Sequence, residues 1–284
     1  MRNLRCIFLL LLFIIMNSLV FASSSRIEGS FSQKDLDARF IGLGTAGAAY
    51  LNGPASVMFN PAGLARDRSI NLALTQVCLF ENLMPATFAG GILPTKIGVF
   101  GLGLIRIDPQ FAGFSYRETD YTVSWSKQIG NFAVGTKLRF LEANGSRASS
   151  GDGTIEGRGK SLDLGVIRQG ERFNTALVLR NVSGEVEGTN YAREVLPLSV
   201  LMGISLSLDP STFLLLDVDD LNTKPIIRLG LEKLLTKEFA LRIGYFEDSF
   251  SAGLGIAYGL VKVDYAYKIT QIEQTGILSV GIQF

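Results

Sequence analysis

Histidine is absent from this 284-residue sequence, which removes the base or proton relay on which most hydrolase sites depend. Only 2 cysteines are present, and Cys6 lies within an apolar N-terminal run, so Cys78 is the single thiol beyond it. One thiol forms no intrachain disulfide and, without histidine, no zinc site of the usual kind. The 27 basic and 26 acidic residues balance, so the chain lacks the basic excess typical of nucleic-acid binding. We therefore expect a protein that is not an enzyme, with no catalytic residues, no metal and no cofactor.

Long apolar runs are also missing beyond the first residues. The chain opens MRNLRCIFLLLLFIIMNSLVFASSS, in which Arg2 and Arg5 precede the apolar run. Val20 and Ala22 satisfy the small-residue rule for cleavage before Ser23. The run is shorter than a preferred membrane anchor, and an uncleaved anchor is the alternative. We predict that residues 1–22 are a signal peptide and that the rest of the chain is exported.

The stretch FIGLGTAGAAYLNGPASVMFNPAGLA raises the question of a nucleotide site, because Gly42, Gly44 and Gly47 follow the spacing G-x-G-x-x-G. That fingerprint has meaning when a buried strand precedes the glycines and a helix comes after them. Here the preceding residues SQKDLDARFI are mostly polar, and Pro54 and Pro61 interrupt the segment after the glycines. A dinucleotide turn is therefore disfavoured, and the glycines need another role.

From residue 69 onward the chain is a series of apolar/polar alternations bounded by Gly, Pro, Asn, Asp or Ser. In FAVGTKLRF, apolar side chains alternate with Lys137 and Arg139. A period of two is typical of strands with one buried face. The segments with this pattern are 69–80, 84–92, 96–107, 118–127, 131–141, 161–167, 173–181, 196–206, 211–217, 225–233, 238–246, 250–257, 260–268 and 276–284.

The connections between these segments alternate in length. Longer links come after the third, fifth, seventh and thirteenth segments (DPQFAGFSYR, EANGSRASSGDGTIEGRGK, VSGEVEGTNYAREV and ITQIEQT), and tight links come after the even-numbered ones. A transmembrane barrel has short periplasmic turns and longer external loops, whereas a soluble sandwich has no reason to sort its loops by parity. The pattern predicts an all-β fold, a closed antiparallel transmembrane β-barrel of about fourteen strands.

Charged residues occupy alternate positions of several predicted strands. They would be costly against lipid and are tolerated in a polar lumen, so we predict that seven residues face the lumen: Lys137, Arg139, Arg228, Glu232, Arg242, Lys262 and Asp264. Aromatic residues on the apolar face are predicted near strand ends, in interface girdles or in ordinary sheet packing: Tyr121, Trp125, Phe132, Phe140, Tyr245 and Tyr265. The acidic run Asp217, Asp219 and Asp220 is interpreted as a solvated loop end rather than a calcium site, because no spaced loop of oxygen ligands comes after it.

Both ends of the mature chain resemble a known superfamily. The ending ILSVGIQF looks like the last strand of an outer-membrane barrel as read by the barrel assembly machinery, and the residues that carry this are Leu278, Val280, Ile282 and Phe284. The segment GLGTAGAAYLNGPASVMFNPAGLA resembles the start of mature proteins related to the long-chain fatty-acid transporter FadL and to the PorV group. SLDLGVI, ALVLRNVSG, LPLSVLMGISL, LLLDVDD, IRLGLEK, FALRIGY and VKVDYAY extend the resemblance, on its PorV side, over nearly the whole mature chain.

The resemblance implies three parts: a signal peptide (1–22), an N-terminal hatch or plug segment (23–68) and an outer-membrane β-barrel (69–284). The hatch residues that it implies are Gly42, Gly44, Gly47, Asn60, Pro61, Ala62 and Gly63. Small residues let a backbone lie close to a crowded wall, and proline fixes a turn without needing a donor. A merely structural lead-in to the first strand is the alternative.

Two functions are implied by the resemblance. The first is transport of hydrophobic or small amphipathic molecules across the outer membrane of a Gram-negative-type bacterium. The second is a non-enzymatic barrel that holds or shuttles proteins of a secretion system. The implied partners are outer-membrane lipid, the barrel assembly machinery, and a hydrophobic ligand or a secretion-system protein, with no nucleic acid. The chain is much shorter than the fatty-acid transporters, which argues against an elaborate external capture site, and transport is slightly favoured.

Overall fold

The computed structural model describes residues 31, 36–80, 83–111, 113–147, 154–188, 191–221, 225–271 and 273–284. The predicted signal peptide and the GDG sequence at residues 151–153 lie outside these ranges. The chain divides into two units after residue 32, and the helices and strands named in this section belong to the unit Gln33–Phe284.

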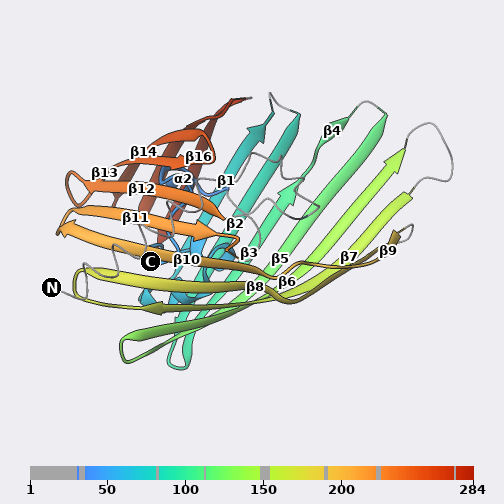
Figure 1. Ribbon diagram of the computed structural model, residues 1–284. Helices are drawn as coiled ribbons and strands as arrows, with labels where there is room; N and C mark the ends of the chain where they lie inside the picture. Colours follow the sequence, from blue (N-terminus) through green and yellow to red (C-terminus); the bar gives the residue numbers. More distant parts are fainter. Residues whose placement is uncertain are drawn as a thin grey trace. The chain divides into compact units, whose positions relative to one another are not determined.

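Within the described residues, fourteen strands form a closed antiparallel ring (Figure 1). The ring strands are β1 (Asn71–Leu79), β2 (Met84–Thr95), β3 (Gly98–Ile107), β5 (Phe114–Ile129), β6 (Phe132–Arg147), β7 (Thr154–Arg168), β8 (Phe173–Gly188), β10 (Ser199–Asp209), β11 (Thr212–Asp219), β12 (Ile226–Leu234), β13 (Phe239–Phe246), β14 (Ser249–Tyr258), β15 (Val261–Ile269) and β16 (Gln274–Gln283). Two short strands lie off the ring: β4 (Gln110–Phe111) pairs with β5, and β9 (Tyr191–Val195) pairs with β8. The predicted closed barrel is confirmed.

Two pairings close the ring. Strand β16 pairs with β1, where Val280 lies opposite Leu74, and β10 pairs with β8, where Val200 lies opposite Leu179. Each ring strand therefore has a neighbour on both sides. Backbone N–H and C=O groups are then satisfied without water, which is the condition for crossing hydrocarbon.

The two ends of the barrel differ in their connections. At one end, called here the short-turn end, strands are joined at residues 96–97, 130–131, 169–172, 210–211, 235–238 and 259–260. The C-terminal Phe284 lies at this end, where its N–H bonds to the carbonyl of Ile70 just before β1. The opposite, long-loop end carries the connections 108–113, 189–198 and 220–225, together with the tight turn at 247–248.

The long links that the sequence predicts after its fifth and seventh segments are mostly strand, so that expectation was wrong. β6 continues to Arg147, β7 begins at Thr154 and β8 continues to Gly188. In these extensions the outward positions are polar, as at Glu142 and Asn144. The apolar alternation that marks a strand in the sequence therefore stops, whereas the backbone ladder continues.

The outward face of β6 changes character partway along the strand. Phe132 and Phe140 are exposed at 47% and 50%, and the next outward positions are Glu142 and Asn144, also exposed. An apolar band bordered by polar side chains is typical of a lipid-facing barrel surface. Tyr121 is the cross-strand partner of Phe140, and both lie near the middle of 16-residue strands. Their predicted place near strand ends was wrong; they mark the border of the apolar band.

In the described residues before the first strand there are three short helices: α2 (Ala38–Gly42), α3 (Ala55–Met58) and the 3₁₀ helix η1 (Pro61–Arg66). The side chain of Asp37 accepts a hydrogen bond from the Phe40 N–H and so caps α2. Helices this short are unstable alone and depend on packing. In the described part of the chain, no helix has both the length and the apolar character needed to cross a membrane.

Candidate functional site

Residues 36–67, called here the lumenal segment, lie within the ring of strands. Helix α2 contacts β13 to β16, α3 contacts β2, β3 and β5, and η1 contacts β3, β5, β6 and β7. Figure 1 shows these helices, in blue, among the strands. Because strands from opposite parts of the ring contact one short segment, the segment occupies the barrel interior.

Two of the predicted hatch glycines permit close backbone approach to β12, β13 and β14. Gly44 has a φ of +61°, and a Cβ there would lie 2.5 Å from the carbonyl oxygen of Leu229. Across this contact, a Cβ on Gly244 would overlap the backbone of Gly44. Gly42 lies against Gly253, whose Cα is 3.1 Å from the position of an added Cβ. Side chains at these positions would push the lumenal segment away from the wall.

The Asn-Pro-Ala motif folds the lumenal segment on itself and against β6. The Asn60 side chain accepts from the Ala62 N–H at 3.0 Å and donates to the Ala48 carbonyl at 2.6 Å. Pro61 begins η1, where its missing N–H leaves no donor unsatisfied. Gly135 of β6 makes room for this turn, because a Cβ there would lie 2.5 Å from the Ala62 nitrogen.

The remaining two predicted hatch glycines make contacts within the lumenal segment. A Cβ on Gly47 would lie 2.6 Å from Cγ of Leu51, and a Cβ on Gly63 would lie 2.5 Å from the Leu51 carbonyl oxygen. The N–H groups of Gly47 and Ala48 also donate to Oδ2 of Asp217, at 2.8 and 2.9 Å. One carboxylate of the wall therefore holds this turn by two backbone donors.

The acidic run on β11 faces the interior, so its interpretation as a solvated loop end was wrong. Asp217, Asp219 and Asp220 are exposed by only 0, 2 and 4%. Arg228 and Arg180 donate to Asp219 Oδ2 at 2.7 and 2.8 Å. Buried carboxylates are tolerated when they are paired in this way. The available sequence signal was the alternation of Asp217 and Asp219 with apolar residues in LLLDVDD.

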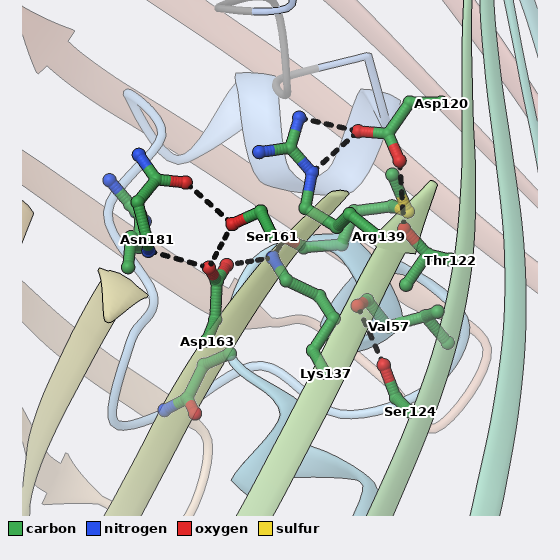
Figure 2. A network of polar contacts seen from close by, with 12 residues as sticks. Val57, Asp120, Thr122, Ser124, Lys137, Arg139, Ser161, Asp163 and Asn181 are labelled. Atoms are coloured by element: carbon green, nitrogen blue, oxygen red, sulfur yellow. Dashed lines mark hydrogen bonds and ion pairs between the residues drawn. The ribbon is translucent and has the colours of Figure 1, made fainter. Parts of the chain in front are cut away.

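A second polar network joins β5, β6 and β7 to the lumenal segment (Figure 2). The Lys137 ammonium donates to the Met58 carbonyl at 2.6 Å and pairs with Asp163 at 2.7 Å. Asp163 also accepts from the Asn181 N–H at 2.8 Å. At this place β8 shifts register against β7, between Leu162 and Leu164. The buried ion pair thus connects the lumenal segment to an irregularity in the wall.

Three further contacts in Figure 2 extend this network. Arg139 donates to Asp120 at 2.7 Å, and Thr122 donates to the same carboxylate at 3.0 Å. The Ser124 hydroxyl donates to the Val57 carbonyl at 3.1 Å. Two carbonyls of helix α3 therefore accept hydrogen bonds from the wall: that of Val57 from the neutral Ser124 and that of Met58 from the charged Lys137.

A third network lies on the opposite side of the interior. Glu232 accepts from Arg39 at 3.1 Å, from the Tyr50 hydroxyl at 2.5 Å and from Arg242 at 2.5 Å. Arg242 in turn donates to Asp264 at 2.6 Å. The carboxylate of Glu232 is 1% exposed and lies between two cations. It joins the lumenal segment to β12, β13 and β15.

The pKa of Asp37 reflects this environment. Burial is the larger cause and the negative charge of Asp264 the second, and together they raise the pKa of Asp37 to about 6, from an ordinary value of 3.8. The Phe40 N–H, Arg39 and Arg242 oppose this shift. Burial thus shifts the titration of Asp37 toward the neutral carboxyl, relative to an exposed aspartate.

The seven charges predicted to face the lumen belong to these networks or border them. Lys137, Arg139, Arg228, Glu232 and Arg242 are buried, Asp264 is half-buried, and Lys262 is exposed two residues away on the same face of β15. The sequence did not predict their partners, which are Arg39, Tyr50, Asp120, Asp163 and Asp219, or Arg180, which shares Asp219 with Arg228. Within the described residues, no group of three or more acidic, cysteine or histidine side chains could hold a metal ion.

The four residues predicted as an assembly signal lie on the outward face of the last strand. Leu278, Val280, Ile282 and Phe284 are exposed at 49, 41, 40 and 61%. Their cross-strand neighbours on β1 and β15 continue the apolar surface, as Leu74 does opposite Val280. These side chains form part of the apolar band.

Taken together, a closed antiparallel ring, an apolar outward band and a charged interior filled by an N-terminal segment define a β-barrel of the transmembrane class. No family model matches the chain, and no curated protein matches it. Solved structures do match, and they identify the barrel type.

The Ralstonia pickettii toluene transporter TbuX aligns with a TM-score of 0.66 and 13% identity, covering 89% of this chain and 100% of that chain. The P. putida toluene transporter TodX aligns with a TM-score of 0.67 and 11% identity, covering 86% of this chain and 97% of that chain. A Pseudomonas aeruginosa FadL homologue aligns with a TM-score of 0.60 and 10% identity, covering 88% of this chain and 98% of that chain. The chain therefore has the fold of the FadL-like outer-membrane barrels, as its resemblance to the long-chain fatty-acid transporter superfamily predicts.

Proposed function

We propose that this protein is an outer-membrane channel for hydrophobic or small amphipathic molecules. The observation that carries the proposal is an apolar stripe on the inner wall, near the long-loop end. Its members are Val77, Ala86, Phe88, Ile105, Ile107 and Ile277, all exposed by 4% or less. The inner positions of β5 to β8, β11 to β13 and β15 instead carry the charged side chains described above. An apolar stripe beside a charged wall suits a path for an apolar solute.

The lumenal segment covers this stripe. Leu36, Met58 and Leu64 belong to the same buried apolar cluster as the stripe. Passage therefore requires that part of the segment move, and we propose that it acts as the hatch. In this proposal residues 1–22 direct export, 23–68 form the hatch and 69–284 the barrel, with assembly machinery reading the last strand. The toluene transporters of the same fold support the solute class by analogy.

Uptake of an apolar probe tests the proposal. Cells that express the protein should take up toluene faster than cells without it, and uptake of glycerol should change little. Ile107→Asp places a charge in the stripe and should reduce toluene uptake, whereas Leu102→Asn, on the outward face of β3, is the matched control. Equal toluene uptake with and without the protein, when heat-modifiable barrel is present in the outer membrane, would contradict transport.

Deletion of residues 42–63 tests the hatch separately. The barrel should still assemble, because the strands of the ring are paired without the segment. Conductance in planar bilayers should increase and become less selective. An assembled deletion variant with unchanged conductance would exclude the hatch role.

A second candidate function is an interaction barrel of a secretion system. The observation in its favour is the extension of β5 to β9 beyond the apolar band, where the outward side chains are polar and exposed, as at Arg117, Arg158 and Glu187. Cross-linking from these positions in intact cells distinguishes the candidates, since a stoichiometric protein partner favours interaction and its absence favours transport.

A further inference from the structure

A cavity of about 440 Å³ lies at the short-turn end, away from the apolar stripe. It is lined by Arg66, the last residue of η1, by Arg68, which lies between η1 and β1, and by Gln128, Gln169 and Asn174 of the wall, with glycines of the adjacent turns. Its volume is in the range of small-molecule sites. The lining contains two guanidinium groups and three carboxamides, with no carboxylate among the residues that form it.

Arg66 is half-buried and differs from the other arginines of the interior in its partners. Arg39, Arg139, Arg180 and Arg242 each pair with a carboxylate within 3.1 Å. Arg66 instead donates to two backbone carbonyls, those of Tyr50 and Ala49, at 3.0 and 2.9 Å.

The charge on Arg66 is therefore poorly compensated. Its Nε is buried and has no hydrogen-bond partner among the described residues. The neighbouring Asp67 carboxylate accepts from the Gly53 N–H at 2.8 Å and makes no ion pair with Arg66. Burial lowers the pKa of Arg66, with Asp67 opposing that shift, as expected for a cation removed from water.

The cavity also offers donors that the protein does not use internally. Gln128 and Gln169 bond to each other through their amides at 3.1 and 3.2 Å. Asn174 donates one amide N–H to Ser205. An amide nitrogen carries two N–H groups, so Gln169 and Asn174 each retain one. Arg68 is exposed and makes a single bond of 3.3 Å, to the Ala65 carbonyl.

We propose that this cavity binds a compact oxyanion, a carboxylate or a phosphate. Guanidinium groups match the planar or tetrahedral arrangement of oxyanion acceptors, and an anion here would compensate Arg66. Because Arg66 lies at the end of the lumenal segment and Arg68 directly follows the segment, while Gln128 and Gln169 come from the wall, the bound anion bridges the two. The site therefore holds the end of the segment to the barrel, whatever passes through the lumen.

Calorimetric titration of the folded mature protein in detergent, at constant ionic strength, tests this site. The probes are inorganic phosphate, acetate and decanoate, with decanol as the uncharged counterpart of decanoate. We expect the three anions to bind and decanol not to bind at this site. Similar affinity for acetate and decanoate identifies the natural ligand as a small free oxyanion. Tighter binding of decanoate, in competition with acetate, identifies the head of an amphipathic acid.

Two variants and a control locate the binding. Arg68→Gln removes an exposed charge that holds little structure, and we expect affinity to fall about tenfold, as for loss of a charge-assisted hydrogen bond. Arg66→Gln should abolish binding if it folds. Arg158→Gln, exposed on β7 at the long-loop end, carries the same charge change and should bind normally. No binding heat with any anion, or equal affinity in Arg68→Gln and Arg158→Gln, would overturn the proposal.

Discussion

The buried pair of Lys137 and Asp163 provides a direct test of how the lumenal segment is held. In Lys137→Met the side chain stays unbranched, becomes apolar, is shorter by its terminal atom and loses its charge. The substitution removes the 2.6 Å hydrogen bond to the Met58 carbonyl and the 2.7 Å ion pair with Asp163. Both side chains of the pair are 0% exposed, so water does not replace the lost partner.

The expected cost derives from this burial. Breaking a buried ion pair by removing one partner costs about 3–5 kcal/mol. Asp163 keeps its hydrogen bond from the Asn181 N–H. We therefore expect a loss of stability near the lower end of that range, about 3 kcal/mol. That is roughly a hundredfold shift toward release of the segment, because each 1.4 kcal/mol is tenfold. Lys137→Met with Asp163→Asn removes both charges and should recover much of the loss.

Thiol labelling measures the release. In a Cys78→Ser background, Ala62→Cys places a thiol where the native side chain is 0% exposed. Labelling should accelerate about a hundredfold in Lys137→Met if opening is followed by fast reclosing.

The matched control for this substitution is Lys160→Met. Lys160 pairs with Glu185 at 3.1 Å, but its side chain is 71% exposed, so its loss should cost about 0–1 kcal/mol. Equal labelling rates in Lys137→Met and Lys160→Met would refute the assignment of the buried pair as an anchor.

Three other predictions concern separate parts of the molecule. Gly44→Ala should release the segment, because its Cβ would meet the Leu229 carbonyl at 2.5 Å; faster labelling of the same reporter thiol is expected, and an unchanged rate contradicts the close approach. The pKa of Asp37 is raised from 3.8 to about 6 in the packed state. The stability that Asp37 contributes to that state is therefore full below pH 3.8 and is lost as pH rises through about 6. Labelling of the reporter thiol in the protein with native Asp37 should accelerate across that pH window, and the same dependence of labelling rate on pH in Asp37→Asn would contradict this. Phe284→Asp should lower outer-membrane levels, at a cost of up to a few kcal/mol for a lipid-facing charge, and normal levels would argue against the role of the last strand.

Much of the barrel could be predicted because its signal is local. Each ring strand has one face toward lipid, and a period of two in hydrophobicity results directly from the geometry of a pleated strand. The pattern in FAVGTKLRF therefore indicates both a strand and the inward direction of Lys137 and Arg139. Strand number and antiparallel order came from repeating this reading along the chain.

The strand extensions could not be predicted in the same way. Beyond Phe140 the outward face meets water, so Glu142 and Asn144 carry no alternation in hydrophobicity. The ladder between β6 and β7 continues through backbone hydrogen bonds, which leave no mark in the sequence of side chains. The interpretation of Asp217 and Asp219 failed for a related reason, since their partners are distant in sequence: the N–H groups of Gly47 and Ala48 for Asp217, and Arg228 and Arg180 for Asp219.

The sequence by itself determined that the chain from residue 69 onward alternates its side chains between an apolar and a polar surface, and therefore that it forms a barrel. Only the tertiary structure decided which charges meet inside, where Arg66 remains without a carboxylate, and how Gly44 and Gly244 bring the lumenal segment against the wall. Alternation is a property of each strand alone, whereas these contacts join residues up to about two hundred positions apart and exist only after the ring has closed.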